Sequence, residues 1–528
     1  MDSKINKFYV VLLSVIVALG GFLLGFDSAV IAGAVPYYSQ IFGLDQASFW
    51  FGFSVSSLTV GSIAGNFIGG ILADKYGRKI VLIATAILFT FCALGSALTS
   101  DLTFFITSRI IGGLGVGMAI LVAPMYIAEV APQKYRGTLV SVNQLNIVLG
   151  ITVAFFSNFF INKSITDPDL NWRWMLGVGA IPAVLYFLLL FLVPSSPRWL
   201  AQRGRADEAK KILSRIGGDS YANATLKEIE NSIEKDKNRE KAYFKELFSP
   251  AMKWILIIGL GIAALQQLSA INAILYYAPI IFETAGGGRD AAFMQAVIIG
   301  LVNLVFTIVA MFLIDRLGRK PLLVMGLTGI IIAYVLSSYA FFQAEYKITD
   351  ESVATISAEL AKENKLTPEN TISLTTALES MKDINYSSEI AFFSAVKEKT
   401  GELYNNDIKN LVLKNSINMN AILVLVGILL FIASFAISLG PVTWALLSEI
   451  FPNRIRGLAI SVAGTFNALV SATIVTVFPM ELAVFGSGTT FAIFAVICLA
   501  GLLFVLKFIP ETKGKSLEQI EDQLTMRH

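Results

Sequence analysis

The stretch DKYGRK at residues 74–79 returns as DRLGRK at residues 315–320. A second stretch, EVAPQKYRG at 129–137, returns as EIFPNRIRG at 449–457, and in both copies a Glu precedes an Arg by seven residues. The first pair is offset by 241 residues and the second by 320, and the difference of 79 is close to the length of a polar segment at 344–416. The motifs therefore predict two repeated halves in the same orientation, with that segment inserted in the second half.

The composition is that of a membrane protein. Hydrophobic residues make up 55% of the 528 residues and charged residues 15%, against about 25% charged residues in soluble proteins, and the mean hydropathy is +0.68. The apolar runs do not alternate as barrel strands would, so an all-α polytopic membrane protein with twelve transmembrane helices is predicted. The predicted spans are residues 8–36, 49–72, 80–99, 103–128, 138–161, 174–194, 253–284, 291–314, 320–343, 417–447, 457–482 and 486–509.

The distribution of Lys and Arg predicts the orientation. Residues 195–252, between the sixth and seventh spans, hold many of these side chains, and the opposite loops hold very few. Because cytoplasmic loops carry the excess of positive charge, we expect both termini in the cytoplasm and the chain in the cell (inner or plasma) membrane. The predicted parts are an N-terminal half at 1–194, a cytoplasmic helical linker at 195–252, a C-terminal half at 253–509 and a cytoplasmic tail at 510–528.

The insertion at 344–416 is then extracellular or periplasmic. Within it, SVATISAEL and EIAFFSAVKEK predict short helices. Two interpretations stay open: a small lid or ornament without a role in transport, or a segment that binds a partner or controls access.

The repeated charged motifs lie at cytoplasmic ends of predicted helices. Opposite charges at the junction of two rocking bodies can pair in one state and separate in the other, so we expect them to form a cytoplasmic latch. The alternative is that they only anchor the topology. The predicted latch residues are Asp74, Arg78, Glu129, Arg136, Asp315, Arg319, Glu449 and Arg456.

Seven stretches of the sequence form one pattern: GGILADKYGRK, RIIGGLGVGMAILVAPMYIAEVAPQKYRG, PSSPRWL, QQLSAINAILYYAPIIF, DRLGRKPLL, GPVTWALLSEIFPNRIRG and PETKGKSLEQIE. Together they resemble the sugar porter family of the major facilitator superfamily, over residues 8–521 apart from the insertion. In pattern, the sequence is most similar to bacterial proton-coupled pentose (xylose) and hexose symporters and to glucose facilitators. The resemblance implies parallel six-helix halves that rock about a central sugar site. One departure is Ser195, where the family usually carries an acid.

Asp27 is the one carboxylate in the first apolar run. If that span ends near Pro36, Asp27 and Arg109 of span four lie at similar depths, at about 1.5 Å per residue, and are natural partners. Burial favours a protonated carboxylate and a nearby arginine an ionised one, so a pair that forms and breaks would couple proton movement to rocking. The resemblance agrees, since symporters of the family carry an acid here. A static ion pair is the alternative. Residues 177–184 lack the second acid that some symporters carry in span six.

Neutral amides within the spans are candidates for binding sugar hydroxyls, because each amide both donates and accepts. A break near Asn272 would help the amides of span seven to face one point, and the resemblance implies that this span is discontinuous. Tyr276 and Tyr277 follow toward the exterior and are predicted to form an extracellular gate. For any single amide, a buried hydrogen bond between helices is the alternative. Some relatives carry a tryptophan where this chain has Ala468, so the identity of the sugar stays open. The predicted substrate-binding residues are Gln144, Gln266, Gln267, Asn272, Asn303, Trp444 and Asn467.

Other classes of protein are disfavoured. The run GGLGVG at 112–117 lies within a span and follows no strand, so we expect close helix packing there and not nucleotide binding. Cys92 and Cys498 lie in apolar runs and the single histidine is His528, so neither a metal site nor an enzyme is predicted. We expect a monomer whose partners are a small sugar, protons and the lipid bilayer, with no cofactor and no nucleic acid. The predicted function is proton-coupled monosaccharide symport; a sugar uniporter and, less favoured, a non-transporting sugar sensor are the alternatives.

Overall fold

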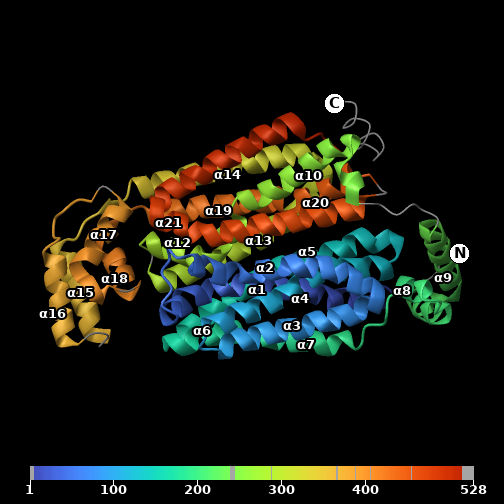
Figure 1. The fold of residues 1–528 in the computed structure, drawn as a ribbon, viewed down its shortest axis with the longest axis horizontal. Helices are drawn as coiled ribbons and strands as arrows, with labels where there is room; N and C mark the ends of the chain where they lie inside the picture. Colours follow the sequence, from blue (N-terminus) through green and yellow to red (C-terminus); the bar gives the residue numbers. More distant parts are fainter. Residues whose placement is uncertain are drawn as a thin grey trace.

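In the computed structural model the chain forms an elongated bundle of roughly parallel helices (Figure 1). The two halves lie on opposite sides of the bundle in this view. A bilayer offers no water to backbone groups, and helices satisfy these groups internally, which is why apolar runs of this length become helices. The structure describes residues 5–237, 244–286, 288–363, 367–386, 388–404, 406–452 and 455–513.

The first half contains six spans, of which the sixth comprises α6 and α7, joined at Val178 and Gly179 with right-handed helical backbone angles. A single turn of 3₁₀ helix, η1, precedes the fifth span. The elements are α1 (Lys7–Ile41), α2 (Phe49–Tyr76), α3 (Arg78–Leu98), α4 (Leu102–Val130), η1 (Gln133–Tyr135), α5 (Arg136–Ser164), α6 (Pro168–Gly177) and α7 (Ala180–Leu190).

The second half contains six further spans. Gly486 has non-helical backbone angles (φ 75°, ψ 162°) inside α21, and it divides α21 into the eleventh and twelfth spans. With that division, the described residues contain the twelve spans that the sequence predicts. The elements are α10 (Pro250–Leu268), α11 (Ile271–Tyr276), α12 (Ala278–Thr284), α13 (Arg289–Leu317), α14 (Arg319–Phe342), α19 (Ala421–Ile437), α20 (Leu439–Ile450) and α21 (Arg456–Phe508).

The end predicted for the first span is wrong. The helix does not stop near Pro36 but continues to Ile41 with Pro36 inside it. Proline is tolerated within a membrane helix because neighbouring groups satisfy the backbone that it frees. Asp27 therefore lies 14 residues before the end of α1, deeper in the bundle than the sequence predicts.

Glycines bring α2 and α4 into backbone contact. A Cβ atom on Gly113 would lie 2.1 Å from the carbonyl oxygen of Leu58, and one on Gly61 would lie 2.0 Å from that of Ile110. No side chain fits in this space, so the close helix packing predicted for residues 112–117 is confirmed.

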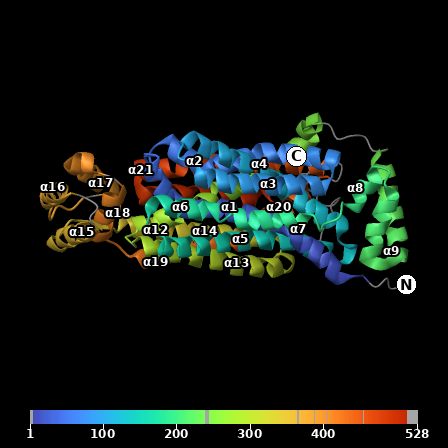
Figure 2. The same ribbon diagram turned by 90° about the horizontal axis from the view of Figure 1, so that it is seen from below.

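The two ends of the bundle carry different attachments (Figures 1 and 2). The linker helices lie at one end, which we call the linker end, and the inserted helices lie at the other, which we call the insertion end. The linker elements are α8 (Pro197–Gln202), α9 (Ala206–Lys237) and η2 (Phe244–Phe248).

The insertion is a small helical unit with a hydrophobic core of its own, which includes Ile356, Leu378, Phe392 and Val412. The two helices predicted within it are confirmed as α15 and α17, whereas α16 and α18 were not predicted. An antiparallel pair of two-residue strands, β1 and β2, closes its base. The elements are β1 (Glu345–Tyr346), α15 (Asp350–Glu363), α16 (Pro368–Glu379), α17 (Glu389–Thr400), η3 (Gly401–Leu403), α18 (Asn406–Ser416) and β2 (Ile417–Asn418).

Candidate transport site

A cavity of about 270 Å³ lies between the two halves. Its lining reaches toward the linker end, and Trp444 near that end is 39% exposed. Small polar side chains that the sequence does not single out also line the cavity. A serine or threonine in an apolar helix commonly bonds its own backbone, so its presence in a span does not by itself predict a binding site. The seven predicted residues that line the cavity are Gln144, Gln266, Gln267, Asn272, Asn303, Trp444 and Asn467, and the further polar ones are Ser28, Thr59, Ser62, Asn66, Thr307 and Ser471.

A break in span seven orients its amides. The first segment, α10, ends at Leu268, and Ala270 adopts a left-handed conformation (φ 60°) before α11 begins. The hydroxyl of Tyr334 donates a hydrogen bond to the carbonyl oxygen of Ser269, which is freed by the break. Because the helix is interrupted, Gln267 and Asn272 can face the same cavity although their spacing on one ideal helix would separate them.

The amides of the second half form one hydrogen-bonded network. Asn467 Nδ2 donates to Gln266 Oε1 over 2.9 Å, and Gln267 Nε2 donates to Asn467 Oδ1 over 3.1 Å. Asn272 Nδ2 donates to Gln267 Oε1 over 3.0 Å and to Ser471 Oγ over 2.8 Å. Each amide is therefore held in one orientation, and the cavity presents a fixed pattern of donors and acceptors. The place of Ser471 in this network was not predicted.

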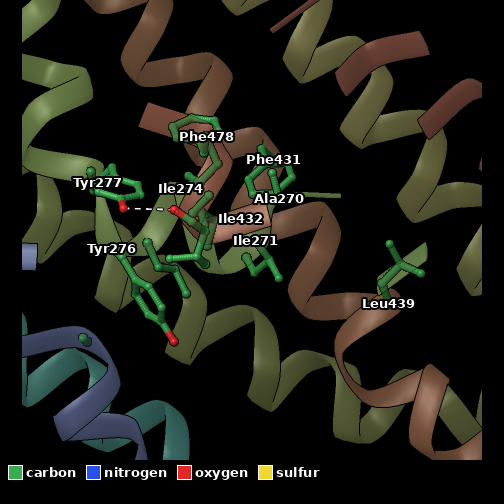
Figure 3. Packing of buried hydrophobic residues seen from close by; sticks show 14 of the residues in the cluster. Ala270, Ile271, Ile274, Tyr276, Tyr277, Phe431, Ile432, Leu439 and Phe478 are labelled. Atoms are coloured by element: carbon green, nitrogen blue, oxygen red, sulfur yellow. Dashed lines mark hydrogen bonds between the residues drawn. The ribbon is translucent and has the colours of Figure 1, made fainter. Parts of the chain in front are cut away.

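The two adjacent tyrosines of span seven have different surroundings. Tyr276 lines the cavity. Tyr277 is fully buried and stacks on Phe51 and Phe478, with ring centroids 6.1 and 5.8 Å away. Its hydroxyl donates to the carbonyl oxygen of Val475 over 3.0 Å, the dashed line in Figure 3, where the two tyrosine side chains point in different directions. Tyr276 can therefore contact a bound molecule directly, whereas Tyr277 belongs to the packing above it.

At the insertion end the two halves are in direct contact. The hydroxyls of Ser56 and Thr476 are 2.7 Å apart, and a Cβ atom on Gly52 would lie only 1.9 Å from the carbonyl oxygen of Thr476. On the other side of the interface, Thr152 Oγ1 donates to the carbonyl oxygen of Gly300 over 2.9 Å. The cavity is thus closed toward the insertion end.

A polar network extends this closure to the outermost turn. The Tyr37 hydroxyl donates to Asn162 Oδ1, and Asn162 Nδ2 donates to Asp290 Oδ1 of the second half over 2.9 Å. The guanidinium of Arg289 lies 4.9 Å from the ring centroid of Tyr37 and 3.3 Å from Glu283. The sequence does not predict this network, because a contact across the halves depends on which state the transporter adopts.

Asp27 and Arg109 are both buried in the first half, at 5% and 2% exposure. Asp27 Oδ2 and Arg109 Nε are buried without a hydrogen-bond partner, and within the described ranges no ion pair joins the two side chains. The charge of Arg109 still acts on Asp27. The direct ion pair expected from their depths is thus not formed in this state, since α1 continues past Pro36 and places Asp27 deeper.

The junction of α6 and α7 in span six lies beside this carboxylate. A Cβ atom on Gly179, between α6 and α7, would lie 3.4 Å from Asp27 Oδ1. The residues around this junction carry no second acid, so a glycine backbone occupies the space next to Asp27.

The predicted latch residues of the first half contact one another at the linker end. Arg78 Nη2 lies 2.9 Å from Glu129 Oε1, and Arg78 Nη1 lies 3.2 Å from Asp74 Oδ1. The hydroxyl of Ser196 donates to the second oxygen of Glu129. Arg136 is the first residue of α5.

The second half repeats this arrangement. Arg319 Nη2 lies 2.8 Å from Glu449 Oε1, and Thr512 Oγ1 donates to Glu449 Oε2 over 2.6 Å. Arg456 Nε donates to the carbonyl oxygen of Phe451 over 3.2 Å. The side chain of Asp315 lies outside the described residues. The ion pairs join residues of the same half, and Ser196 and Thr512 come from the linker and the tail that follow each half, so a latch across the halves stays a prediction for another state.

Two repeated six-helix halves around a cavity with neutral amides in its lining, closed at one end, form the site of an alternating-access transporter of the major facilitator fold. Residues 13–358 and 407–524 match the family of the sugar (and other) transporters. The chain therefore belongs to the sugar porter family of the major facilitator superfamily.

Individual relatives are similar over nearly their whole length. The chain is 36% identical to the arabinose-proton symporter of Bacillus subtilis strain 168, over 97% of this chain and 94% of that protein. It is 32% identical to the D-xylose-proton symporter of Escherichia coli strain K12, over 99% of this chain and 97% of that protein. The inward-open conformation of the xylose transporter XylE from E. coli superposes with a TM-score of 0.74 at 30% identity, over 98% of this chain and 100% of the other.

Proposed function

We propose that this protein is a proton-coupled monosaccharide symporter that works by alternating access. The observation that carries the proposal is Asp27, a buried carboxylate with an unpartnered oxygen, in the half that faces a cavity lined by neutral amides. An ionisable side chain within a membrane span is costly and marks a functional site by default. The relatives named as arabinose-proton and D-xylose-proton symporters support the coupling to protons.

The amide network of the second half binds the sugar. A sugar carries hydroxyls in several directions, and the interlocked amides of Gln266, Gln267, Asn272 and Asn467 offer both donors and acceptors at fixed positions. Gln144, Asn303 and Trp444 complete the site from other helices, the indole covering an apolar face of the ring. Tyr276 closes over the bound molecule.

Asp27 carries the proton, and Arg109 modulates its charge. In a state where Arg109 approaches, the carboxylate is stabilised as an anion; where they separate in a dry surrounding, it holds a proton. The coupling then needs no cofactor, since the proton gradient supplies the free energy.

The conformation corresponds to an inward-facing state. We infer that the linker end is cytoplasmic, because the linker is rich in Lys and Arg, and that the insertion end is extracellular or periplasmic, with the protein in the cell membrane. Rocking to the opposite state opens the insertion end and brings the charged clusters of the linker end together as a latch. We propose that a single chain suffices, since the cavity lies within it.

Proteoliposomes with a panel of pentoses, hexoses and polyols test this function. Adding the transported sugar outside should make the external medium alkaline as protons enter with it. Downhill sugar entry without alkalinisation would make the protein a uniporter, and sugar binding without entry would make it a sensor.

A further inference from the structure

The insertion is carried by the second half. It leaves the membrane bundle after α14 and returns to it before α19, with β1 and β2 paired at its base. Glu389 at the start of α17 accepts a hydrogen bond from the backbone N–H of Ser487 over 3.1 Å, at the turn between the last two spans. The helix α18 lies beside α12 in both views of the bundle (Figures 1 and 2). When the second half moves as a body, these contacts move the insertion with it.

One lysine of the insertion reaches the other half. Lys409 Nζ of α18 donates to Gln46 Oε1 over 3.1 Å, and Gln46 lies in the loop between α1 and α2. The ammonium also lies 4.9 Å from the ring centroid of Phe393. Lys409 thus links α18 to the first half of the transporter.

The surroundings of Lys409 are acidic from three directions. Its charge interacts with Asp45 of the first half, with Glu283 of α12 and with Glu389 of α17. Glu283 also pairs with Arg289, which stacks on Tyr37 of the first half. A cation at this position therefore connects the insertion to the polar network that closes the insertion end, and removing it takes away a positive charge with which Asp45, Glu283 and Glu389 interact.

We propose that the insertion is a clamp on the insertion end: through Lys409 it holds the first half's α1–α2 loop, stabilises the closed insertion end and slows its opening. The clamp rests on the alternating access of the proposed function, because only rocking separates Lys409 from Gln46. The family match passes over residues 359–406, which include α16 and α17, and resumes at residue 407, so it covers Lys409.

Opening of the insertion end can be measured with a reporter cysteine. Ser56 is fully buried between the halves, and the native Cys92 and Cys498 are buried as well. In a Ser56→Cys chain, a membrane-impermeant maleimide added outside should react only when this end opens. Lys409→Ala and, separately, Gln46→Ala should raise the labelling rate at least about fivefold. Each variant loses one hydrogen bond with a charged donor at a partly exposed site, and this factor is the expected effect of that loss.

Lys399→Ala is the matched control, since Lys399 is exposed on α17 of the same insertion. It should leave the labelling rate unchanged. Gln46→Ala lies outside the insertion, so a rise in both variants is not explained by unfolding of the insertion. Labelling at the native rate in both Lys409→Ala and Gln46→Ala would overturn the clamp. The readout needs no sugar and no proton flux, so a failure of the symport proposal remains distinguishable.

A reversible cross-link tests the same contact in the opposite direction. In a Gln46→Cys, Lys409→Cys chain, a short bifunctional thiol reagent with a cleavable disulfide should stop sugar uptake, and reductant should restore it. Each single cysteine variant, treated with the same reagent, should transport as before. Unchanged uptake by the cross-linked protein would contradict the proposal, since the two segments would then not separate during the cycle.

Discussion

The two halves repeat one architecture but differ inside it. The first half buries a charged pair, Asp27 and Arg109, with an unpartnered carboxylate oxygen and an unpartnered guanidinium nitrogen. At the corresponding face the second half holds neutral amides that bond one another, such as Gln266 with Asn467. An unpartnered charge responds strongly to small changes of its surroundings, whereas a satisfied network keeps its geometry. We infer that the first half responds to the change of conformational state and that the second half recognises the sugar.

The charged clusters at the linker end of the two halves, around Glu129 and around Glu449, differ by one acid. Ser196 bonds Glu129 in the first half as Thr512 bonds Glu449 in the second. The residue before Thr512 is Glu511, whose carboxylate accepts from the backbone N–H groups of Arg319 and Lys320 over 3.1 and 3.0 Å and so caps the start of α14. The residue before Ser196 is Ser195, which lacks this carboxylate. The charged cluster of the second half therefore has a helix cap that the cluster of the first half lacks.

The largest effect is expected from Asp27→Asn. The substitution removes the group that exchanges the proton but keeps the size of the side chain, so sugar accumulation against its gradient should fall to a ratio of about one while exchange of labelled sugar continues. Uptake into proteoliposomes with an imposed pH gradient measures both.

A second carboxylate within the spans provides the control. Glu481 lies in α21 of the second half and has a buried oxygen without a partner within the described residues. Glu481→Gln should leave the accumulation ratio unchanged. Loss of accumulation in this variant as well would break the distinction between the halves.

Next in size are substitutions in the amide network. Asn467→Ala removes the donor to Gln266 Oε1 and the acceptor of Gln267 Nε2, so two amides lose one of their hydrogen bonds and sugar affinity should fall about 10- to 30-fold. Ser471→Ala removes only one acceptor for Asn272, and a loss of about threefold is expected. Displacement of labelled sugar from the purified protein gives both values. Equal losses, or a larger loss for Ser471→Ala, would contradict the network as described.

The sequence predicts some parts of this site well and others not at all. Amides are rare in apolar spans, and Gln266, Asn303 and Asn467 were predicted on that ground, but the same ground does not separate them from Asn66, which lines the cavity and was missed, or from Asn158, which does not line it. Contacts across the halves, such as that of Asn162 with Asp290, could not, because they depend on the state of the whole molecule. The predicted end of α1 was wrong because a proline signals a helix end in water but not in a membrane.

Smaller effects, on stability, are expected at the charged clusters of the linker end. Burial raises the pKa of Glu511, but the backbone N–H groups of Lys513, Arg319 and Lys320 outweigh it, and the pKa is lowered from 4.5. Stability from this group is therefore fully present above pH 4.5 and is lost as the pH falls through the lowered pKa. Glu511→Gln should cost about 0.5–1 kcal/mol near neutral pH, at the low end for a cap because solvent screens it.

Thermal unfolding in detergent at neutral and acidic pH measures this cost. The difference between native and Glu511→Gln should vanish at low pH. Ser195→Glu, the matched change in the first half, should raise the unfolding temperature if its carboxylate caps α3. A pH-independent difference for Glu511→Gln would show that the cap does not act through its charge.

The smallest effect is expected at the break of span seven. Ala270 has φ 60°, a left-handed conformation that costs a residue with a Cβ atom about 1 kcal/mol. Glycine adopts it freely but loses more entropy on folding, so Ala270→Gly should stabilise by no more than about 0.5 kcal/mol. Ala270→Val should destabilise instead, and the unfolding temperatures of the two variants should bracket the native one.

The most direct test of the central claim is simultaneous measurement of proton and sugar entry in the same proteoliposomes, for the native chain and for Asp27→Asn. The account predicts a fixed ratio of protons to sugar for the native chain and sugar exchange without protons for the variant. Equal proton entry in both would place the proton elsewhere, and sugar entry without protons in both would make Asp27 and Arg109 structural residues of a facilitator.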